Sequence, residues 1–251
     1  MNVLRVRLLL TSPYHPITMS DSIERKRTAR LAGLLFFLWI ISGFYDMMYV
    51  SPKIFVSGDN AASTQNILQH ELLFRTGIFS GLVTNVLWIL LVWVFYKLFK
   101  PVHQQYAKLL VYFVLVQIPV AFSTVGFRVA ALLTLKAEAL KSFDPTQRND
   151  LAMLFLKLND YSVLGIELFW GLWLFPLAIL VYHSGFIPRL IGIWLIINGI
   201  VYVVLSFTSI VFPDYKDLVF TYGMPAMFGE LVLMFWLLIK GTRDTPVVES
   251  K

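Results

Sequence analysis

Long apolar stretches separated by short polar segments run through most of the chain. A helix of about 20 residues crosses a hydrocarbon layer about 30 Å thick, and six stretches reach that length. Because a backbone in lipid must satisfy its own hydrogen bonds, we expect these stretches to be helices. The predicted spans are Leu31–Val50, Gly77–Phe99, Ala107–Leu135, Met153–Tyr182, Leu190–Phe212 and Tyr222–Lys240. The predicted fold class is therefore all-α: a polytopic integral membrane helix bundle with six transmembrane helices.

The spans form one predicted domain, residues 25–241. We expect residues 1–24 to be an N-terminal tail that is either disordered or upstream of the true start, for which Met19 is the candidate. Residues 242–251 form a short polar tail. Between the first two spans, Asn60–Phe74 is predicted as an amphipathic helix. Between the third and fourth spans, Asp144-Pro145 predicts a turn or a helix start.

Composition supports burial in lipid. Of the 251 residues, 58% are hydrophobic and 14% are charged, whereas soluble domains carry about 25% charged residues. These charges are too few to cover a surface in water, which excludes a soluble globular enzyme and a disordered chain. The chain has no cysteine, which excludes disulfides, thiolate metal sites and cysteine nucleophiles.

Sequence motifs for catalysis and cofactor binding are missing. The chain contains no Gly-x-Ser-x-Gly, His-Glu-x-x-His, phosphate-loop or dinucleotide-binding pattern. Its four histidines lie in tails and loops on both sides of the predicted bundle, so they cannot share a metal ion. We therefore predict no catalytic residue, no metal ligand, no cofactor and no nucleic-acid partner.

Lysine and arginine gather on one side of the predicted spans. With the N-terminus in the cytoplasm, thirteen of the 21 Lys and Arg residues lie in cytoplasmic segments and six in external ones. The densest run, Arg25-Lys26-Arg27-Thr28-Ala29-Arg30, directly precedes the first span. The positive-inside rule then predicts that both termini are cytoplasmic. The formal net charge of +6 reflects this topology and attraction to anionic lipid.

Several polar side chains fall inside the predicted spans. An ionisable group at the centre of a membrane helix costs about 2.5–3.5 kcal/mol, so such groups usually face the bundle interior and have partners. The candidate ligand-binding residues chosen on this basis are Arg128, Asp160, Glu167, Glu230, Asp46 and Asn198. In the predicted topology the charged ones lie in the outer half of the bilayer, except Glu167, which lies near the middle. The acids outnumber the arginines, so we expect at least one carboxyl to carry a proton or bind a cation.

Two interpretations of these charges stay open. In the first, Arg128 pairs with Asp160 and Glu167, and the charges only fix helix packing. In the second, the charges line an outward-facing cavity for a small molecule, a cation or a proton. Prolines inside three spans would kink the helices and help to open such a cavity; they are Pro119, Pro176 and Pro225.

Two segments carry a resemblance to a known family. They are Ile187-Pro188-Arg189-Leu190-Ile191-Gly192-Ile193-Trp194 and the run from Pro225-Ala226-Met227-Phe228-Gly229-Glu230 to Trp236-Leu237-Leu238-Ile239-Lys240-Gly241. With Lys26–Gly33 and Gly126-Phe127-Arg128, they resemble a prokaryotic family of membrane proteins, the domain of unknown function numbered 4386. The resemblance implies an integral protein of a prokaryotic cytoplasmic membrane, and it implies no reaction.

The resemblance also bears on Arg128. Members of the family often carry an acidic residue one turn after this arginine, whereas Val129-Ala130-Ala131-Leu132 follows it here. We therefore expect Arg128 to pair with Asp160, Glu167 or Glu230.

Three functions follow from the sequence. The first is a protein that binds, or also transports, a small molecule, cation or proton at a polar site in the outer half of the bundle. The second is a membrane scaffold or regulatory subunit whose intramembrane charges are structural. The third is an intramembrane enzyme that uses Glu167 or Glu230 as an acid or base, for which no nucleophile is evident. The expected partners are the lipid bilayer and a small-molecule or ion ligand.

Overall fold

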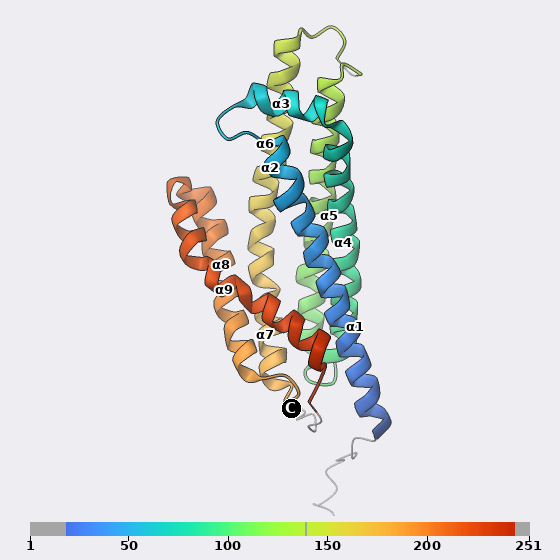
Figure 1. The fold of residues 1–251 in the computed structure, drawn as a ribbon. Helices are drawn as coiled ribbons and strands as arrows, with labels where there is room; N and C mark the ends of the chain where they lie inside the picture. The colour runs from blue at the N-terminus through green and yellow to red at the C-terminus, as the bar shows by residue number, and fades with distance from the viewer. Residues whose placement is uncertain (1–18, 139, 244–251) are drawn as a thin grey trace, which may run out of the picture.

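The computed structural model of the chain describes residues 19–138 and 140–243. Within these residues the chain is almost entirely helical (Figure 1), and an isolated bridge joins Val56 to Asp59. The elements are α1 (Met19–Phe44), the π-helix η1 (Tyr45–Val50), α2 (Ser51–Ile54), α3 (Asn60–Gln69), α4 (Glu71–Phe99), α5 (Gln104–Leu135), α6 (Pro145–Leu172), α7 (Leu174–His183), α8 (Arg189–Val211), the 3-10 turn η2 (Pro213–Tyr215), α9 (Lys216–Phe235) and the π-helix η3 (Trp236–Lys240).

Six stretches of the described residues are long and apolar enough to cross a membrane. They are Met19–Ile54, Glu71–Phe99, Gln104–Leu135, Pro145–His183, Arg189–Val211 and Pro213–Lys240. Each predicted span lies inside one of them or matches it to within one residue, which confirms the all-α polytopic bundle. Many large apolar side chains lie on the surface, among them Leu34, Val116 and Ile210, as expected where lipid takes the place of water.

Some predicted boundaries were wrong. Asn60–Phe74 is not one helix, because α3 ends at Gln69 and the backbone of His70 breaks the helix before α4 begins. Residues 19–24, predicted as tail, belong to α1, since the helix continues through the basic run. Residues 1–18 and 244–251 lie outside the described residues. The predicted helix start at Asp144 is confirmed: Asp144 caps α6 in a capping box with Gln147.

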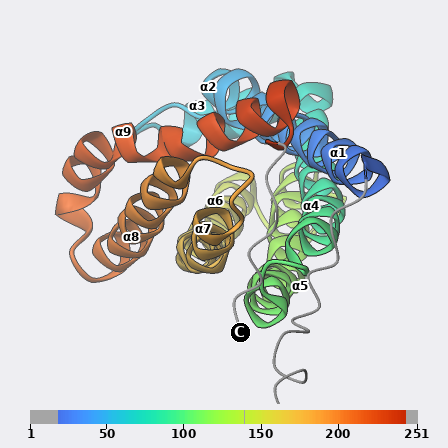
Figure 2. The same ribbon diagram turned by 90° about the horizontal axis from the view of Figure 1, so that it is seen from below.

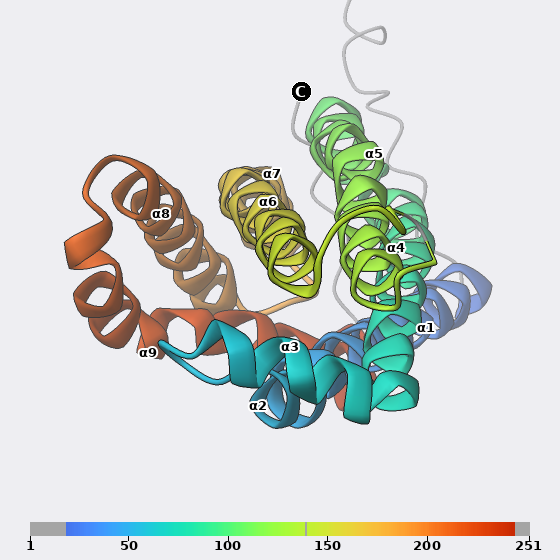
Figure 3. The ribbon, with the colours of Figure 1, turned by 90° about the horizontal axis from the view of Figure 1, so that it is seen from above.

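The spans follow one another around a ring in chain order (Figures 2 and 3). Each span packs on the next, from α1 and α4 through α5, α6 and α7 to α8 and α9, and η3 closes the ring against α1. The contact between η3 and α1 is tight because Gly33 has no side chain. A carbon added to Gly33 would lie 2.7 Å from the Leu238 Cα atom and 2.8 Å from the Leu237 carbonyl carbon.

The two ends of the bundle differ in charge. The basic run of α1, the α4–α5 turn and η3 lie at one end, which we name the basic end; the other is the distal end (Figure 1). At the distal end α3 crosses the bundle. There α8 and α9 form a hairpin that stands to one side of α4, α5 and α6.

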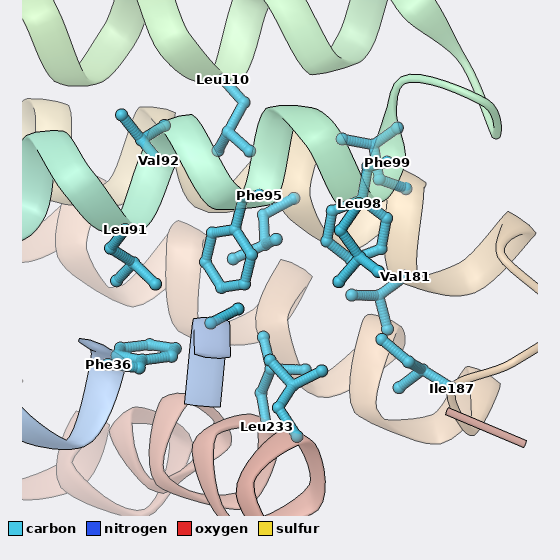
Figure 4. Packing of buried hydrophobic residues seen from close by; sticks show 14 of the residues in the cluster. Phe36, Leu91, Val92, Phe95, Leu98, Phe99, Leu110, Val181, Ile187 and Leu233 are labelled. Atoms are coloured by element: carbon cyan, nitrogen blue, oxygen red, sulfur yellow. The ribbon is translucent and has the colours of Figure 1, made fainter. Parts of the chain in front are cut away.

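Two hydrophobic clusters hold the helices together. The larger one lies toward the basic end and contains Phe36, Phe95 and Leu233 (Figure 4) together with Trp173. Trp39 contacts Phe36 and Trp173, with ring centroids 5.6 and 6.4 Å apart. The smaller cluster lies at the distal end and joins η1, α2 and α3 to α4, α5 and α6.

Candidate functional site

The Arg128 guanidinium on α5 binds the Asp46 carboxylate on η1 at two points. Arg128 Nη1 donates to Asp46 Oδ2 at 2.8 Å, and Arg128 Nη2 donates to Asp46 Oδ1 at 3.1 Å. The guanidinium carbon also lies 4.9 Å from the centre of the Phe74 ring, a favourable cation–π contact. Arg128 is buried, whereas the Asp46 side chain is 27% exposed. The pair is formally neutral, and the buried Arg128 Nε has no hydrogen-bond partner among the described residues.

A glycine on α4 makes this pair possible. A carbon added to Gly77 would collide with Asp46 Oδ1, lie 2.9 Å from Val50 Cγ1 and lie 3.2 Å from Arg128 Nη2. Gly77 therefore leaves the space in which Arg128 of α5 donates its hydrogen bonds to Asp46 of η1. Gly81, four residues later, has open space around it, so the two glycines do not form one packing face.

The expectation that Arg128 pairs with Asp160, Glu167 or Glu230 was wrong. Its partner is Asp46, because the distal part of the first span bends through a π-helix beside α4, where Gly77 leaves room for the contact. The sequence did contain a signal: Gly77 is a residue without a side chain at the distal end of the second span.

A second polar group lies between α6, α8 and α9. Asn198 Nδ2 on α8 donates to Glu230 Oε1 on α9 at 3.0 Å. Both residues are buried, with exposed fractions of 0% for Asn198 and 7% for Glu230. Among the described residues, no lysine, arginine or histidine forms an ion pair with Glu230 within 4.0 Å.

Tyr202 lies beside this group. It stands one turn beyond Asn198 on α8, within reach of the Glu230 carboxyl, and Glu167 on α6 acts on it only electrostatically. Its ring packs edge-on against Trp170, with the centroids 6.0 Å apart. Sequence reasoning missed Tyr202, although its spacing of four residues from Asn198 places both on one helix face. We name Glu167, Asn198, Tyr202 and Glu230 the carboxyl cluster.

The carboxyl cluster is rich in acceptors and poor in donors. Glu167 Oε2 and Asn198 Oδ1 are buried oxygen atoms without a hydrogen-bond partner among the described residues. Lys216, at the start of α9, attracts Glu167 only over a longer distance. A site of this kind can accept a proton or coordinate a cation through oxygen atoms.

The depth of Glu230 differs from the expectation. Because α9 begins at Lys216 rather than Tyr222, Glu230 lies about 21 Å along the helix from Lys216 and about 15 Å from Lys240 at 1.5 Å per residue. It therefore lies nearer the basic end of its helix than the distal end.

Asp160 stands apart from both groups. It is exposed on α6, and Asn159 Nδ2 donates to its Oδ1 at 3.0 Å. The structure thus divides the six candidate residues. Asp46 and Arg128 form the ion pair, Asn198 and Glu230 lie in the carboxyl cluster with Glu167, and Asp160 contacts neither group in the described hydrogen bonds. No three His, Cys, Asp or Glu side chains of the described residues are placed to hold a metal ion.

A comparison with known families identifies the family of this chain. Residues 31–241 match a family described as "Domain of unknown function (DUF4386)", and the match includes both polar groups. The chain belongs to this family. The extent expected from the resemblance, about Lys26 to Gly241, agrees with that match.

This DUF4386 chain also has an archaeal relative. A protein of Archaeoglobus fulgidus described as "Uncharacterized protein" is 35% identical over 91 residues, which are 36% of this chain and 53% of the relative. The chain thus spans about half the length of the relative that it matches. No solved structure matches the chain.

Proposed function

We propose that this multi-pass membrane protein binds a proton or a small cation at the carboxyl cluster. The observation that carries the proposal is the Glu230 carboxyl, which is buried and accepts from Asn198 but has no basic partner within 4.0 Å among the described residues. A bare carboxylate removed from water is costly, so it is stable as the protonated acid or beside a cation. The unpartnered oxygen atoms of Glu167 and Asn198 add acceptors beside it.

The charge balance favours a cation over an anion. Arg128, the arginine that is buried in the distal half of the described residues, is already neutralised by Asp46 in a two-point contact. The carboxyl cluster contains two acids, an amide and a phenol, and Lys216 acts on it only from a distance. An anionic ligand would meet repulsion there, whereas a cation would replace the missing donors.

Asp160 supports an entry route from the distal end. It lies seven residues before Glu167, two turns along the same face of α6, or about 10 Å at 1.5 Å per residue. Its exposed carboxyl would collect cations at the mouth of the route, and Glu167 would stand between it and Glu230.

The test uses the full-length protein in lipid nanodiscs. Infrared difference spectra would be recorded during a pH titration, with and without Na⁺, and the carbonyl stretch of protonated carboxyl groups would be followed. We expect a band that titrates in the wild type, is lost in Glu230→Gln and is retained in Asp160→Asn. The Gln side chain still accepts from Asn198, so this variant keeps the packing.

The outcomes separate the ligands. Suppression of the band by Na⁺ identifies a cation site, and a band unaffected by Na⁺ identifies a proton site. A titration that is identical in the wild type and Glu230→Gln would overturn the proposal.

A scaffold function is the second candidate, and the Arg128–Asp46 pair favours it. This pair is formally neutral and its guanidinium packs on Phe74, as expected of a structural charge pair. If the scaffold alone is correct, Glu230→Gln has no effect on proton or cation binding, and function depends on a partner protein. An intramembrane enzyme gains no support, because no serine or threonine accompanies the two carboxyls among the described contacts.

We also propose that the protein resides in the cytoplasmic membrane of a prokaryotic cell with its basic end in the cytoplasm. The archaeal relative and the basic residues gathered at one end of the bundle support this placement. Protease accessibility of a tag at either terminus in right-side-out vesicles tests it: tags that are cleaved only after the membrane is permeabilised support it.

A further inference from the structure

Basic side chains from the two ends of the described chain meet where η3 crosses α1. A carbon added to Gly241 would lie 3.0 Å from Lys26 Cγ and 3.5 Å from Arg30 Cγ. Lys240 directly precedes this glycine, and Arg25 Nη2 donates to the carbonyl oxygen of Arg243 at 3.4 Å. The closure of the helix ring therefore brings the basic run of α1 beside Lys240, the last residue of η3.

Three of the basic side chains at this crossing have no acidic partner among the described residues. Lys26, Arg30 and Lys240 form no ion pair within 4.0 Å with any described acidic residue. Arg30 and Lys240 are exposed, and Lys26 is partly exposed. The packing at Gly241 thus brings together the two segments that carry Lys26, Arg30 and Lys240, and these side chains are available to an anion.

Apolar side chains continue from these cations into the membrane-spanning part. On α1, Leu34 and Leu38 are exposed beyond Arg30, and on η3 and α9, Ile239 and Phe235 are exposed before Lys240. A ligand bound at the crossing would therefore meet positive charge at the end of the span and apolar surface alongside it. This is the chemical pattern of a phospholipid with an anionic headgroup.

We propose that the crossing of α1 and η3 is a binding site for an anionic phospholipid. Lys26, Arg30 and Lys240 hold the phosphate, and the exposed side chains of α1 and η3 contact the acyl chains. The site lies where the ring of helices closes, so the bound lipid ties the first and last spans together. It is separate from the carboxyl cluster and does not rest on the ion-binding proposal.

Native mass spectrometry of the detergent-purified full-length protein tests the site. The protein would be titrated with phosphatidylglycerol and with phosphatidylcholine of matched acyl chains. Each basic side chain that lies against the anionic headgroup contributes about fivefold to the affinity for the lipid. The variant Lys26→Gln/Arg30→Gln/Lys240→Gln should therefore bind phosphatidylglycerol about 100-fold more weakly and bind phosphatidylcholine unchanged.

A matched variant removes the same charge from the same end of the molecule. Lys97→Gln/Lys100→Gln/Lys108→Gln changes three lysines around the α4–α5 turn, of which Lys97 lies over the Trp93 ring and Lys100 faces the Tyr96 ring. We expect less than about a fivefold loss of phosphatidylglycerol affinity, because these residues lie outside the site. The charge-retaining variant Lys26→Arg/Arg30→Lys/Lys240→Arg should keep the wild-type affinity and so controls for folding.

Equal losses in the two glutamine variants would overturn the proposal, because general attraction to the basic end would explain the binding. The absence of any preference for phosphatidylglycerol over phosphatidylcholine would also overturn it. Displacement of the lipid by millimolar inorganic phosphate would identify a site for free anions instead of lipid. Na⁺ and proton binding would be measured on the same preparations. A failure of the lipid site can then be told apart from a failure of ion binding at Glu230.

Discussion

Asp46 and Arg128 are 82 residues apart in the chain, yet their side chains share two hydrogen bonds of 2.8 and 3.1 Å. The contact joins the first and third spans across the second, which leaves room for the two hydrogen bonds at Gly77 and packs Phe74 on the guanidinium. The pair therefore depends on the packing of three helices. We expect its removal to lower the free energy of unfolding more than it lowers ligand affinity.

Gly77→Ala should destabilise the protein. The added methyl group collides with Asp46 Oδ1 and approaches Val50 Cγ1 to 2.9 Å. Overpacking of this kind costs about 1–3 kcal/mol. Unfolding of the purified protein in mixed micelles, followed by tryptophan fluorescence, measures the free energy of unfolding. Gly81→Ala is the control, since it has open space around it and an alanine favours the helix by about 0.5–1 kcal/mol. Equal stability of the two variants would contradict the role of Gly77.

Arg128→Met should be more damaging than the double variant Arg128→Met/Asp46→Leu. The single change leaves the Asp46 carboxylate without its partner, whereas the double change removes both charges. Because Asp46 is partly exposed, we expect the single variant to lose about 2–3 kcal/mol and the double variant to recover most of it. Measuring the free energy of unfolding of the wild type, Arg128→Met, Asp46→Leu and the double variant completes a double-mutant cycle. A double variant as unstable as the sum of the two single ones would mean that the residues act independently.

Asn198→Ala should weaken folding by removing the donor to Glu230. The buried carboxyl would lose its 3.0 Å hydrogen bond, and an unsatisfied buried polar group costs about 1–3 kcal/mol. Asn159→Ala provides the comparison, because Asn159 bonds only to the exposed Asp160 in the described contacts. Its expected cost is below about 0.5 kcal/mol. Thermal unfolding midpoints in one detergent rank the two variants, and a larger effect at Asn159 would argue against a structural bond at Asn198.

Gly171→Ala should push α6 away from α8 and disturb the carboxyl cluster. A carbon at Gly171 would lie 2.6 Å from the Gly199 carbonyl oxygen and 2.8 Å from Val203 Cγ2. A backbone oxygen cannot rotate away, so we expect a loss of about 1–3 kcal/mol. Gly165→Ala lies on the same helix and meets nothing within 4 Å, which makes it the matched control. Both variants should be measured for unfolding and for the titrating carboxyl band. If Gly171→Ala leaves both unchanged, the helices tolerate a wider separation than their packing suggests.

The sequence predicted the helices well because lipid imposes a simple rule. A backbone without water must form a helix, and the length of each apolar stretch then sets a span. The errors lie where polar residues extend a helix beyond the apolar stretch. Residues 19–24 continue α1, and Lys216 begins α9 earlier than hydropathy indicates. Hydropathy records the lipid layer, whereas hydrogen bonding sets the helix ends.

The candidate residues could be identified in the sequence by the free-energy cost of placing them in lipid. Their partners could not be identified in this way. A charge inside a span can be recognised in the sequence because it is expensive in lipid. Which charge it meets depends on the rotation of each helix about its axis and on which spans are neighbours. Arg128 meets Asp46 because Gly77 opens a path between them. Tyr202 joins the carboxyl cluster because α8 turns the same face toward α6 and α9.

By itself, the sequence determined that this chain is an all-helical protein of six spans with a basic end and a small set of costly polar residues. Only the tertiary structure decided that these residues form an ion pair and a separate carboxyl cluster. The physical reason is that hydrophobicity acts along the chain and is additive, so it can be summed over a window of residues. Pairing acts across the bundle and depends on where the helices approach closely, as they do at Gly77 beside the Asp46–Arg128 pair.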